Sequence, residues 1–227
     1  GKGANQAVAA ARLGAQVTMV GKLGCDSFGD EMVATLSAEG IDVSNVLRED
    51  STATGVSSVM LDEHGNNRII IIPGSNLRYT SRELRSVEPL IRSSKMIVMQ
   101  LEMDMSIVEE GVSLASKYGV PVLLNPAPAQ KLSDHVMRSV DYLTPNETEA
   151  EILTGVKVID TASAEEAARI LLSKGVKNVV ITLAEKGALI ASKGTVQHIP
   201  GFRVDPVDTV AAGDAFNGAL AVGIIRG

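Results

Sequence analysis

The hydrophobic and polar positions of this chain repeat, for most of its length, in the order strand, turn, helix. Asn5–Leu13 is rich in alanine and predicts a helix that ends at Gly14. Gln16–Val20 follows with aliphatic and β-branched residues, which indicate a strand. Ser27–Ala38 predicts a second helix, closed by Gly40.

Residues 42–75 have a different pattern. Gly55–Leu61 and Asn67–Ile72 are two runs of β-forming residues, and the Asp-Glu-His-Gly-Asn sequence at 62–66 between them favours a hairpin turn. We therefore expect residues 42–75 to form antiparallel strands that project from the main sheet.

The regular alternation returns after Asn76. Helices are predicted at Ser81–Ile91, Ser106–Tyr118, Leu132–Ser139, Glu147–Leu153, Ala164–Ser173 and Gly213–Ile225, and strands at Met96–Gln100, Val120–Leu124, Asp141–Leu143 and Asn178–Thr182. Gly187–Ser192 and Thr195–Ile199 indicate a late hairpin. This spacing predicts an α/β fold in one domain over residues 1–227, with a doubly wound, mainly parallel sheet flanked by helices.

Composition narrows the classes of partner. The chain has 227 residues, 45% of them hydrophobic, and a net charge of −6. The apolar fraction excludes wholesale disorder, and the acidic balance argues against nucleic acid or an anionic membrane as the main partner. The single cysteine, Cys25, can form no disulfide within the chain, and no apolar run approaches the ~18 residues of a membrane span.

Ligands of doubly wound sheets bind at the carboxyl ends of the strands. Polar residues of this chain concentrate in the loops expected there, namely 100–102, 125–128, 144–147, 182–187 and 208–214. These loops are therefore the first places to look for chemistry.

The stretch from Asp208 to Asp214 (Asp-Thr-Val-Ala-Ala-Gly-Asp) leads directly into the last predicted helix. Small residues let a ligand approach the backbone, and the N–H groups of a helix N-terminus can stabilise charge on a phosphoryl group. Asp214 lies in the first turn, where its carboxylate could accept a proton from a hydroxyl. The alternative is a purely structural end, in which Asp208 or Thr209 caps the helix.

A second acidic stretch is Thr-Pro-Asn-Glu-Thr-Glu-Ala-Glu at 144–151. Asn146 and Glu149 are three residues apart, on one helical face, and could hold a hydrated Mg²⁺ beside phosphates. The alternative is a capping box formed by Thr144 and Glu147, with Pro145 in the first helical position.

The opening Gly-Lys-Gly-Ala-Asn-Gln sequence is a loop of small residues that enters a helix. It is neither a P-loop nor a dinucleotide fingerprint. Lys2 and Asn5 could bind the hydroxyls of a polar ligand, or Asn5 could simply cap the helix. Glu102 could likewise accept a ligand hydroxyl or be a solvated acid.

The remaining reactive side chains suggest no site. His64, His135 and His198 have no metal-ligand spacing, and Cys25 has no histidine or cationic neighbour in sequence that would activate it.

Five segments in this order resemble the ribokinase-like (PfkB-type) sugar kinases. Residues 1–7 are similar to the first signature of that family, residues 207–214 to the second, and residues 145–151 to its magnesium-associated motif. Residues 125–129 and 100–102 strengthen the resemblance, which runs from residue 1 to 227.

The resemblance implies a role for each residue of the last loop. Asp214 would be the catalytic base, and the N–H groups of Ala211, Ala212 and Gly213 would form the anion hole for the γ-phosphate. Asp208 and the carbonyl of Val210 would belong to a K⁺ site beside it.

The resemblance also implies the binding residues. Those expected to contact the sugar are Gly1, Lys2, Asn5 and Glu102, and those expected to contact ATP or Mg²⁺ are Asn146, Glu149, Thr182 and Gly187. Strands within 42–75 would belong to a small antiparallel β lid, through which the family also forms homodimers.

Two departures from the family pattern are alanines where glycine is common, at Ala211 and Ala184. The chain opens on Gly1 rather than Met, so we expect a fragment that lacks an upstream strand with a sugar-binding aspartate. Residues of the adenine pocket and the K⁺ site are expected beyond Gly227.

The activity implied is transfer of the ATP γ-phosphoryl group to the C5 hydroxyl of D-ribose, with Mg²⁺ and K⁺ as cations. Alternatives are a related kinase for deoxyribose, fructose or adenosine, or a non-catalytic fragment that binds sugar. A cytoplasmic location is expected, with an organelle left open.

Overall fold

The computed structural model describes residues 1–61, 67–205 and 207–227, without the side chains of residues 59–61 and 67–69. The predicted turn at 62–66 lies outside the described residues. The helices are α1 (Lys2–Arg12), α2 (Ser27–Ala38), α3 (Ser81–Ser86), α4 (Glu88–Ser93), α5 (Met105–Tyr118), α6 (Asp134–Ser139), α7 (Glu147–Thr154), α8 (Thr161–Ser173) and α9 (Ala212–Arg226), with short 3-10 helices η1 (Gly74–Arg78) and η2 (Ala184–Lys186). The strands are β1 (Thr18–Gly24), β2 (Asp42–Glu49), β3 (Val56–Leu61), β4 (Asn67–Ile72), β5 (Ile97–Met99), β6 (Val122–Leu124), β7 (Tyr142–Leu143), β8 (Asn178–Thr182), β9 (Ala188–Ser192) and β10 (Thr195–Ile199).

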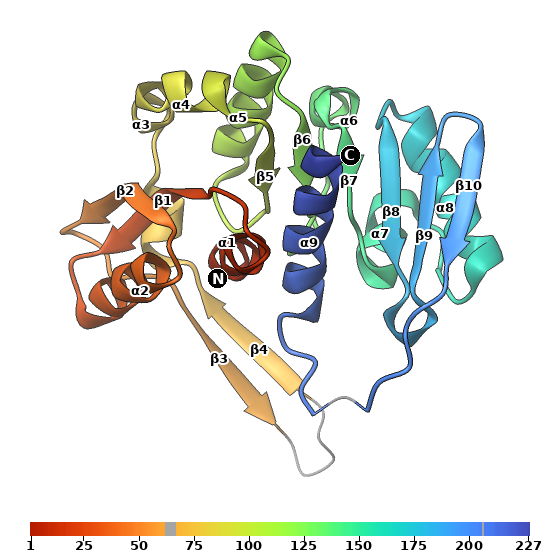
Figure 1. Cartoon of the computed structure of the whole chain (residues 1–227), viewed down its shortest axis with the longest axis horizontal. Coiled ribbons are helices and arrows are strands. Elements are labelled where there is room, and N and C mark those ends of the chain that lie inside the picture. The colour runs from red at the N-terminus through yellow and green to blue at the C-terminus, as the bar shows by residue number, and fades with distance from the viewer. Residues whose placement is uncertain (62–66, 206) are drawn as a thin grey trace.

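The central sheet has six strands in the order β10-β9-β8-β7-β6-β5. Strands β5 to β8 are parallel, and β9 and β10 form the expected late hairpin. The carboxyl ends of β5 to β8 therefore meet at one edge of the sheet, the lower edge in Figure 1. This arrangement confirms the predicted α/β fold with a mainly parallel sheet.

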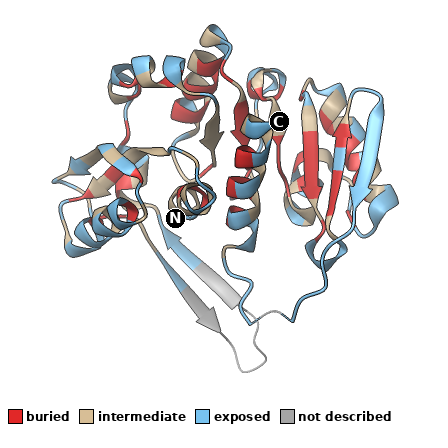
Figure 2. Cartoon of the chain, in the orientation of Figure 1, coloured by how far each residue is buried: buried red, intermediate tan, exposed pale blue. Residues whose placement is uncertain are grey.

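The main core lies between this sheet and helices α5 to α8. Strand β6, in the interior of the sheet, is an unbroken apolar run in which all three residues are buried. Figure 2 shows buried residues along β8, β9 and α9, whereas β10 at the sheet edge is exposed throughout.

A second, two-stranded sheet pairs β1 with β2 in parallel. An apolar cluster containing Leu84, Ile91 and Ile107 covers both sheets, because Val20 of β1 and Ile97 of β5 both pack against it. The two sheets are therefore joined by side-chain packing under α3, α4 and α5.

Helices α1 and α9, from opposite ends of the chain, pack against each other. Gly218 permits this contact, since a Cβ at that position would lie 2.6 Å from the carbonyl oxygen of Gln6 and 2.7 Å from the Cβ of Ala9. Any larger residue would push the two helices apart.

Strands β3 and β4 form an antiparallel pair that projects from the body of the molecule on the side of the carboxyl ends (Figure 1). The expectation of antiparallel strands throughout 42–75 is thus right for β3 and β4 and wrong for β2. Strand β2 pairs in parallel with β1, because α2 provides the crossover between them.

The single helix expected over Ser81–Ile91 is two short helices, α3 and α4, separated at Val87. Pro89 is the physical reason. It has no N–H to donate to the carbonyl of Arg85, and its ring would clash with that carbonyl in a continuous helix.

Among the described residues, no helix is both long and apolar enough to cross a membrane.

Candidate active site

A cavity of about 190 Å³ opens where the parallel strands end. It is bounded by the ends of β6, β7 and β8, by the start of α9 and by Lys2. Its lining residues are Lys2, Asn125, Ala127, Thr144, Asn146, Glu149, Thr182, Thr209, Ala211, Ala212, Gly213, Asp214 and Asn217. Eight of the predicted site residues are in this list: Lys2, Asn146, Glu149, Thr182, Ala211, Ala212, Gly213 and Asp214.

The start of α9 forms one wall of this cavity. Ala211 is in the left-handed conformation, with φ +63°, and turns the chain into the helix without a side-chain cap. The N–H of Ala212 donates to the carbonyl of Thr209 at 3.2 Å. The first-turn N–H groups and the helix dipole give this wall a partial positive charge.

Asp214 follows in the first turn of α9 and is buried, with 6% of its surface exposed. Its Oδ2 accepts a hydrogen bond from Nδ2 of Asn5 at 2.8 Å. Its Oδ1 accepts one from Nε2 of Gln6 at 3.1 Å. The α1–α9 contact therefore brings both ends of the chain onto one carboxylate, and each of its oxygens has an amide partner.

Glu102 lies at the entrance to α1. Its Oε2 accepts from the backbone N–H of Lys2 at 2.7 Å. A Cβ at Gly1 would lie 2.9 Å from the same oxygen, so the Glu102 carboxylate lies directly against the backbone of Gly1. Four residues expected to contact the sugar, Gly1, Lys2, Asn5 and Glu102, thus lie at the N-terminal end of α1 or directly against it.

Asn146 and Glu149 form the capping box that begins α7. The N–H of Glu149 donates to Oδ1 of Asn146 at 2.8 Å, and the N–H of Asn146 donates to Oε2 of Glu149 at 2.9 Å. The alternative box of Thr144 and Glu147, with Pro145 in the first turn, is wrong by two residues. Asn146 still presents its side chain to the cavity from this position.

Burial raises the pKa of Glu149 above its ordinary value. The N–H of Asn146 and the charge of Lys2 oppose the rise, and the negative charge of Asp214 adds to it. Lys2 is the only cationic side chain among the lining residues. The cavity thus holds more negative than positive charge and favours a bound cation.

Six residues predicted for the site lie outside the lining of this cavity: Gly1, Asn5 and Glu102, which lie at the start of α1 or against it, and Asp208, Val210 and Gly187. Asp208 and Val210 are exposed, and Oδ1 of Asp208 accepts the N–H of Val210 at 2.8 Å. Gly187 has φ +96° and lies against the chain that leaves β10, where a Cβ would be 2.5 Å from the N atom of Gly201. The positive φ and the close approach of the backbone at Gly201 explain why residue 187 is a glycine.

Four buried polar residues of the site were not singled out from the sequence: Gln6, Asn125, Thr144 as a hydrogen-bonding group, and Asn217. Asn125 donates to the carbonyl of Thr144 at 3.1 Å, and the hydroxyl of Thr144 donates to Oδ1 of Asn217. Two of them could have been found from the sequence, because a side-chain amide stands out in an otherwise apolar helix. Gln6 precedes the apolar run 7–11, and Asn217 lies within α9.

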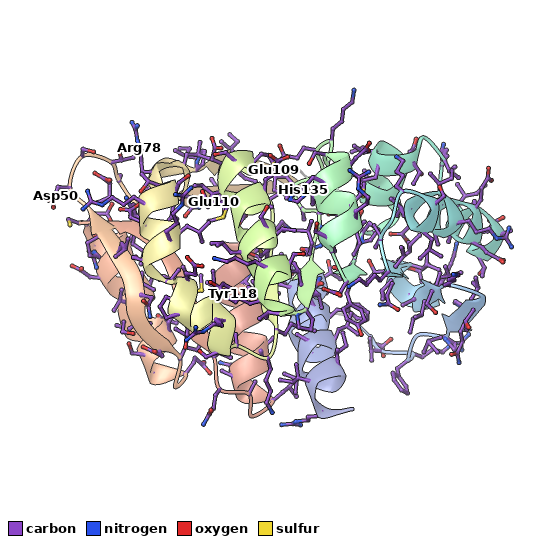
Figure 3. The ribbon with its side chains drawn as sticks, turned by 90° about the horizontal axis from the view of Figure 1, so that it is seen from above. Asp50, Arg78, Glu109, Glu110, Tyr118 and His135 are labelled. Carbon is purple, nitrogen blue, oxygen red and sulfur yellow. The ribbon has the colours of Figure 1, made fainter. Side chains whose placement is uncertain are left out.

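The histidines described here take no part in the cavity. His135 projects from α6 beside α5, near Glu109 (Figure 3). Its Nε2 lies 2.7 Å from the Ser113 hydroxyl, which itself donates to the carbonyl of Glu109. The hydroxyl proton is therefore already committed, and the pair is not a nucleophilic dyad. His198 contacts the carbonyl of Lys186, and His64 lies outside the described residues.

The donor set tests whether Mg²⁺ fits. Within the described ranges, no group of three or more His, Cys, Asp or Glu side chains could hold a metal by itself. Mg²⁺ instead prefers one or two carboxylates, retained waters and substrate phosphates. The half-buried Glu149 carboxylate, with one oxygen held by Asn146, fits such a shared site.

Comparisons with known proteins show which family the chain resembles over its whole length. The family model described as "pfkB family carbohydrate kinase" matches residues 1–227. The chain is 44% identical over 226 residues to a ribokinase of Haemophilus influenzae, covering 100% of this chain and 74% of that protein. It is 40% identical over 222 residues to a deoxyribokinase of Salmonella typhi, covering 97% and 72%. The solved structure of Arabidopsis thaliana ribokinase complexed with ribose and ATP matches with a TM-score of 0.92 and 31% identity, covering 100% and 75%.

Proposed function

The chain belongs to the pfkB family of carbohydrate kinases, and from this membership we propose that it transfers the γ-phosphoryl group of ATP to the C5 hydroxyl of D-ribose. The products are ribose 5-phosphate and ADP. The identity to a ribokinase and the similarity to a ribokinase solved with ribose and ATP support ribose as the acceptor.

One observation carries the proposal. A buried carboxylate, Asp214, occupies the first turn of a helix whose N-terminus lines the same cavity as Glu149 and Lys2. This arrangement sets a proton acceptor beside a backbone site for a phosphoryl group, which are the two elements that phosphoryl transfer to an alcohol needs.

The step is an in-line displacement. Asp214 takes the proton from the C5 hydroxyl, the hydroxyl oxygen forms a bond to the γ-phosphorus, and the bond from that phosphorus to the bridging oxygen breaks. ADP leaves with the electron pair. The backbone N–H groups from Ala211 to Gly213 stabilise the charge that develops on the transferring group, and that of Ala212 does so by exchanging the Thr209 carbonyl for a phosphoryl oxygen.

The remaining residues bind and orient. Lys2, Asn5 and Glu102, with the backbone of Gly1, hold the sugar hydroxyls, and Asn146 and Thr182 contact the nucleotide phosphates, with Gly187 shaping the nucleotide loop. Glu149 would hold Mg²⁺, which would neutralise phosphate charge. Asp208 and the Val210 carbonyl would hold part of a K⁺ site, which would add positive potential near the anion hole.

We extend the proposal to the assembly. Ile70, Ile71 and Ile72 of β4 are each about half exposed, at 51%, 47% and 57%. Successive strand residues face opposite sides, so both faces of the β3–β4 lid are apolar. One face covers the sugar, and the other pairs with the lid of a second copy.

The test is ADP release by the full chain with a panel of acceptors: ribose, 2-deoxyribose, fructose and adenosine. We expect ribose to give the highest kcat/KM. Asp214→Asn should reduce kcat by at least about a hundredfold while nucleotide binding, measured by calorimetry, stays intact. A near-normal rate in Asp214→Asn would show that the base is misassigned.

The 40% identity to a deoxyribokinase favours 2-deoxyribose as the second candidate acceptor. Higher kcat/KM for 2-deoxyribose than for ribose would establish it. A non-catalytic sugar-binding protein would take up ribose in the calorimeter but release no ADP.

A further inference from the structure

Gln6 is the second amide in α1 that reaches Asp214, and it differs from Asn5 in its surroundings. Only 2% of Gln6 is exposed, whereas Asn5 lies at an exposed position. Gln6 therefore contacts Asp214 from inside the protein, and Asn5 contacts it from the solvent side.

Every polar atom of the Gln6 side chain is used. Its Nε2 donates to Oδ1 of Asp214 and to Oδ1 of Asn125, each at 3.1 Å. Its Oε1 accepts from Nε2 of Gln100 at 2.6 Å. Because an amide nitrogen carries exactly two N–H donors, the amide has no spare donor for another partner.

These partners allow only one orientation of the amide. If it turned over, its oxygen would face the oxygens of Asp214 and Asn125, and its nitrogen would face the nitrogen of Gln100. Three favourable contacts would become three repulsive ones. A buried polar network of this kind fixes the geometry of its members.

The network continues from Asn125 to the strand ends and back to α9. The side-chain amide of Asn125 donates to the backbone carbonyl of Thr144. The side-chain hydroxyl of Thr144 donates to Oδ1 of Asn217. Nδ2 of Asn217 then donates to the carbonyl of Gly213 at 2.8 Å. The carboxylate of Asp214 and the backbone of the residue before it are thus held by one connected set of side chains.

From this geometry we infer that Gln6 is a positioning residue for the base: it holds Oδ1 of Asp214 from the interior, so that Oδ2, on the Asn5 side, is the oxygen that accepts the substrate proton. The inference rests on the proposed function. Oδ2 retains a lone pair after accepting from Asn5, whereas Oδ1 is directed into the protein. Gln6 contacts the base through Oδ1 of Asp214 and so acts on the reaction through that carboxylate.

The experiment compares three variants of the full chain. Gln6→Met keeps the length of the side chain and removes the donor, so Asp214 can rotate. We expect kcat to fall by about 10- to 100-fold while the KM for ribose changes less than about threefold. Gln100→Met removes the hydrogen bond that orients Gln6. It should also lower kcat with little change in KM, but its fold-reduction of kcat should be about a tenth of that in Gln6→Met or less.

Gln6→Glu provides a readout that a structural role alone would not move. A second carboxylate against Oδ1 favours the protonated form of Asp214, so the acidic limb of the kcat profile should shift up by about one pH unit or more. Val112→Ala in the α5 core is the matched control for lost stability, and its acidic limb should stay at the wild-type pH.

Wild-type kcat in Gln6→Met together with an unmoved acidic limb in Gln6→Glu would overturn the inference. If Gln6→Met does not fold, the pH dependence of kcat in Gln6→Glu and the value of kcat in Gln100→Met test the inference in its place. Loss of activity in Asp214→Asn alongside unaffected Gln6 variants would leave the proposed function standing, whereas a wild-type chain inactive on every sugar would defeat the function itself.

Discussion

Ala211 and Ala184 adopt positive φ values of +63° and +48° without being glycine. A Cβ in the left-handed region is strained against the neighbouring backbone, at about 1–2 kcal/mol per residue. Both alanines belong to loops of the proposed ATP site, so the site holds backbone strain at two positions.

Ala211→Gly should therefore stabilise the protein. Relief of the Cβ contact exceeds the extra freedom of glycine in the unfolded chain, and we expect Tm to rise by about 1–3 °C. Ala219→Gly, at an exposed position within α9, is the matched control and should lower Tm by about 2–4 °C. Equal losses in both variants, measured by calorimetry, would show that Ala211 is unstrained.

Glu149→Gln tests the cost of the buried carboxylate. Because the pKa of Glu149 is raised in the folded protein, its contribution to stability is present below the unfolded pKa and is lost as pH rises through the folded value. The variant should be more stable than wild type at pH 7 to 8, with the difference vanishing in acid. The Mg²⁺ concentration for half-maximal rate should rise by about tenfold.

Thermal unfolding across pH and a Mg²⁺ titration measure these effects. Glu151→Gln, at an exposed position of the same helix α7, is the control and should change neither. A Glu149→Gln variant that is less stable at pH 7 than at pH 4, relative to wild type, would contradict the expectation.

The start of α7 shows why the sequence did not predict the correct capping residues. The motif placed Asn146 and Glu149 together, but the capping box was expected at Thr144 and Glu147. The sheet ladder continues past β7, since Thr144 N–H donates to the Leu124 carbonyl and Thr182 N–H donates to the Pro145 carbonyl. The chain stays extended until Asn146, and this pairing is invisible in a local pattern.

At the scale of elements, the β3–β4 pair, which we propose as the lid, is anchored through the N-terminus of α2. Asp26 caps α2 by accepting the N–H of Gly29 and also accepts the N–H and hydroxyl of Thr54, each at 2.7 Å, directly before the lid. These hydrogen bonds lower the pKa of Asp26. At the other lid root, the N–H of Ser75 donates to the carbonyl of Ala53 at 2.9 Å.

Asp26→Asn should loosen this anchor, because the new amide can accept at only one of its two ends. A lid that is closed for a smaller fraction of the time raises the apparent KM for sugar, by about tenfold, with kcat changed less than about threefold. Steady-state kinetics measure both constants.

Asp160→Asn is the matched control. Asp160 caps α8 through the N–H of Ser163 in the same manner but has no hydrogen bond to the lid among the described residues. Its variant should retain the wild-type KM. An equal rise in both variants would assign the effect to lost helix capping and not to the lid.

Element type was predictable where periodicity was strong, as in α5, α8 and β8. It failed where a single residue or a distant partner decides the outcome. Pro89 divides α3 from α4, and the parallel pairing of β2 follows from its position beside β1. Neither the break nor the pairing changes the local hydrophobic pattern.

For the whole molecule, the site depends on contact between the two ends of the chain. Asn5 and Asp214 are 209 residues apart in sequence and meet because α1 and α9 pack at Gly218. Hydrophobic periodicity predicted both helices, and the small and polar residues at their starts marked both loops as candidate sites. Only the family resemblance placed them in one site, because helical patterns do not encode which helix lies against which.

The two apolar faces of the lid lead to the last prediction. Ile71 lies opposite Ser57 across the β3–β4 pair and faces one side, whereas Ile72 lies opposite Val56 and faces the other. If one face covers the sugar and the other pairs with a second copy, a lysine on each face should have a different consequence. One of Ile71→Lys and Ile72→Lys should raise the sugar KM while leaving the molecular mass unchanged. The other should weaken dimerisation by about a hundredfold in sedimentation equilibrium, because a charge would be buried without a partner.

Ile190→Lys, an exposed position on β9 outside the lid, is the control for added charge and should alter neither mass nor KM. A wild-type protein that is monomeric at all concentrations would exclude a lid dimer. So would two lid variants that both keep the dimer intact, because a lysine on the paired face cannot be accommodated without cost. If one of the Ile71 and Ile72 variants raises only the sugar KM and the other weakens only dimerisation, the two faces of the β3–β4 sheet have different roles. One face then contacts the sugar, and the opposite face forms the dimer.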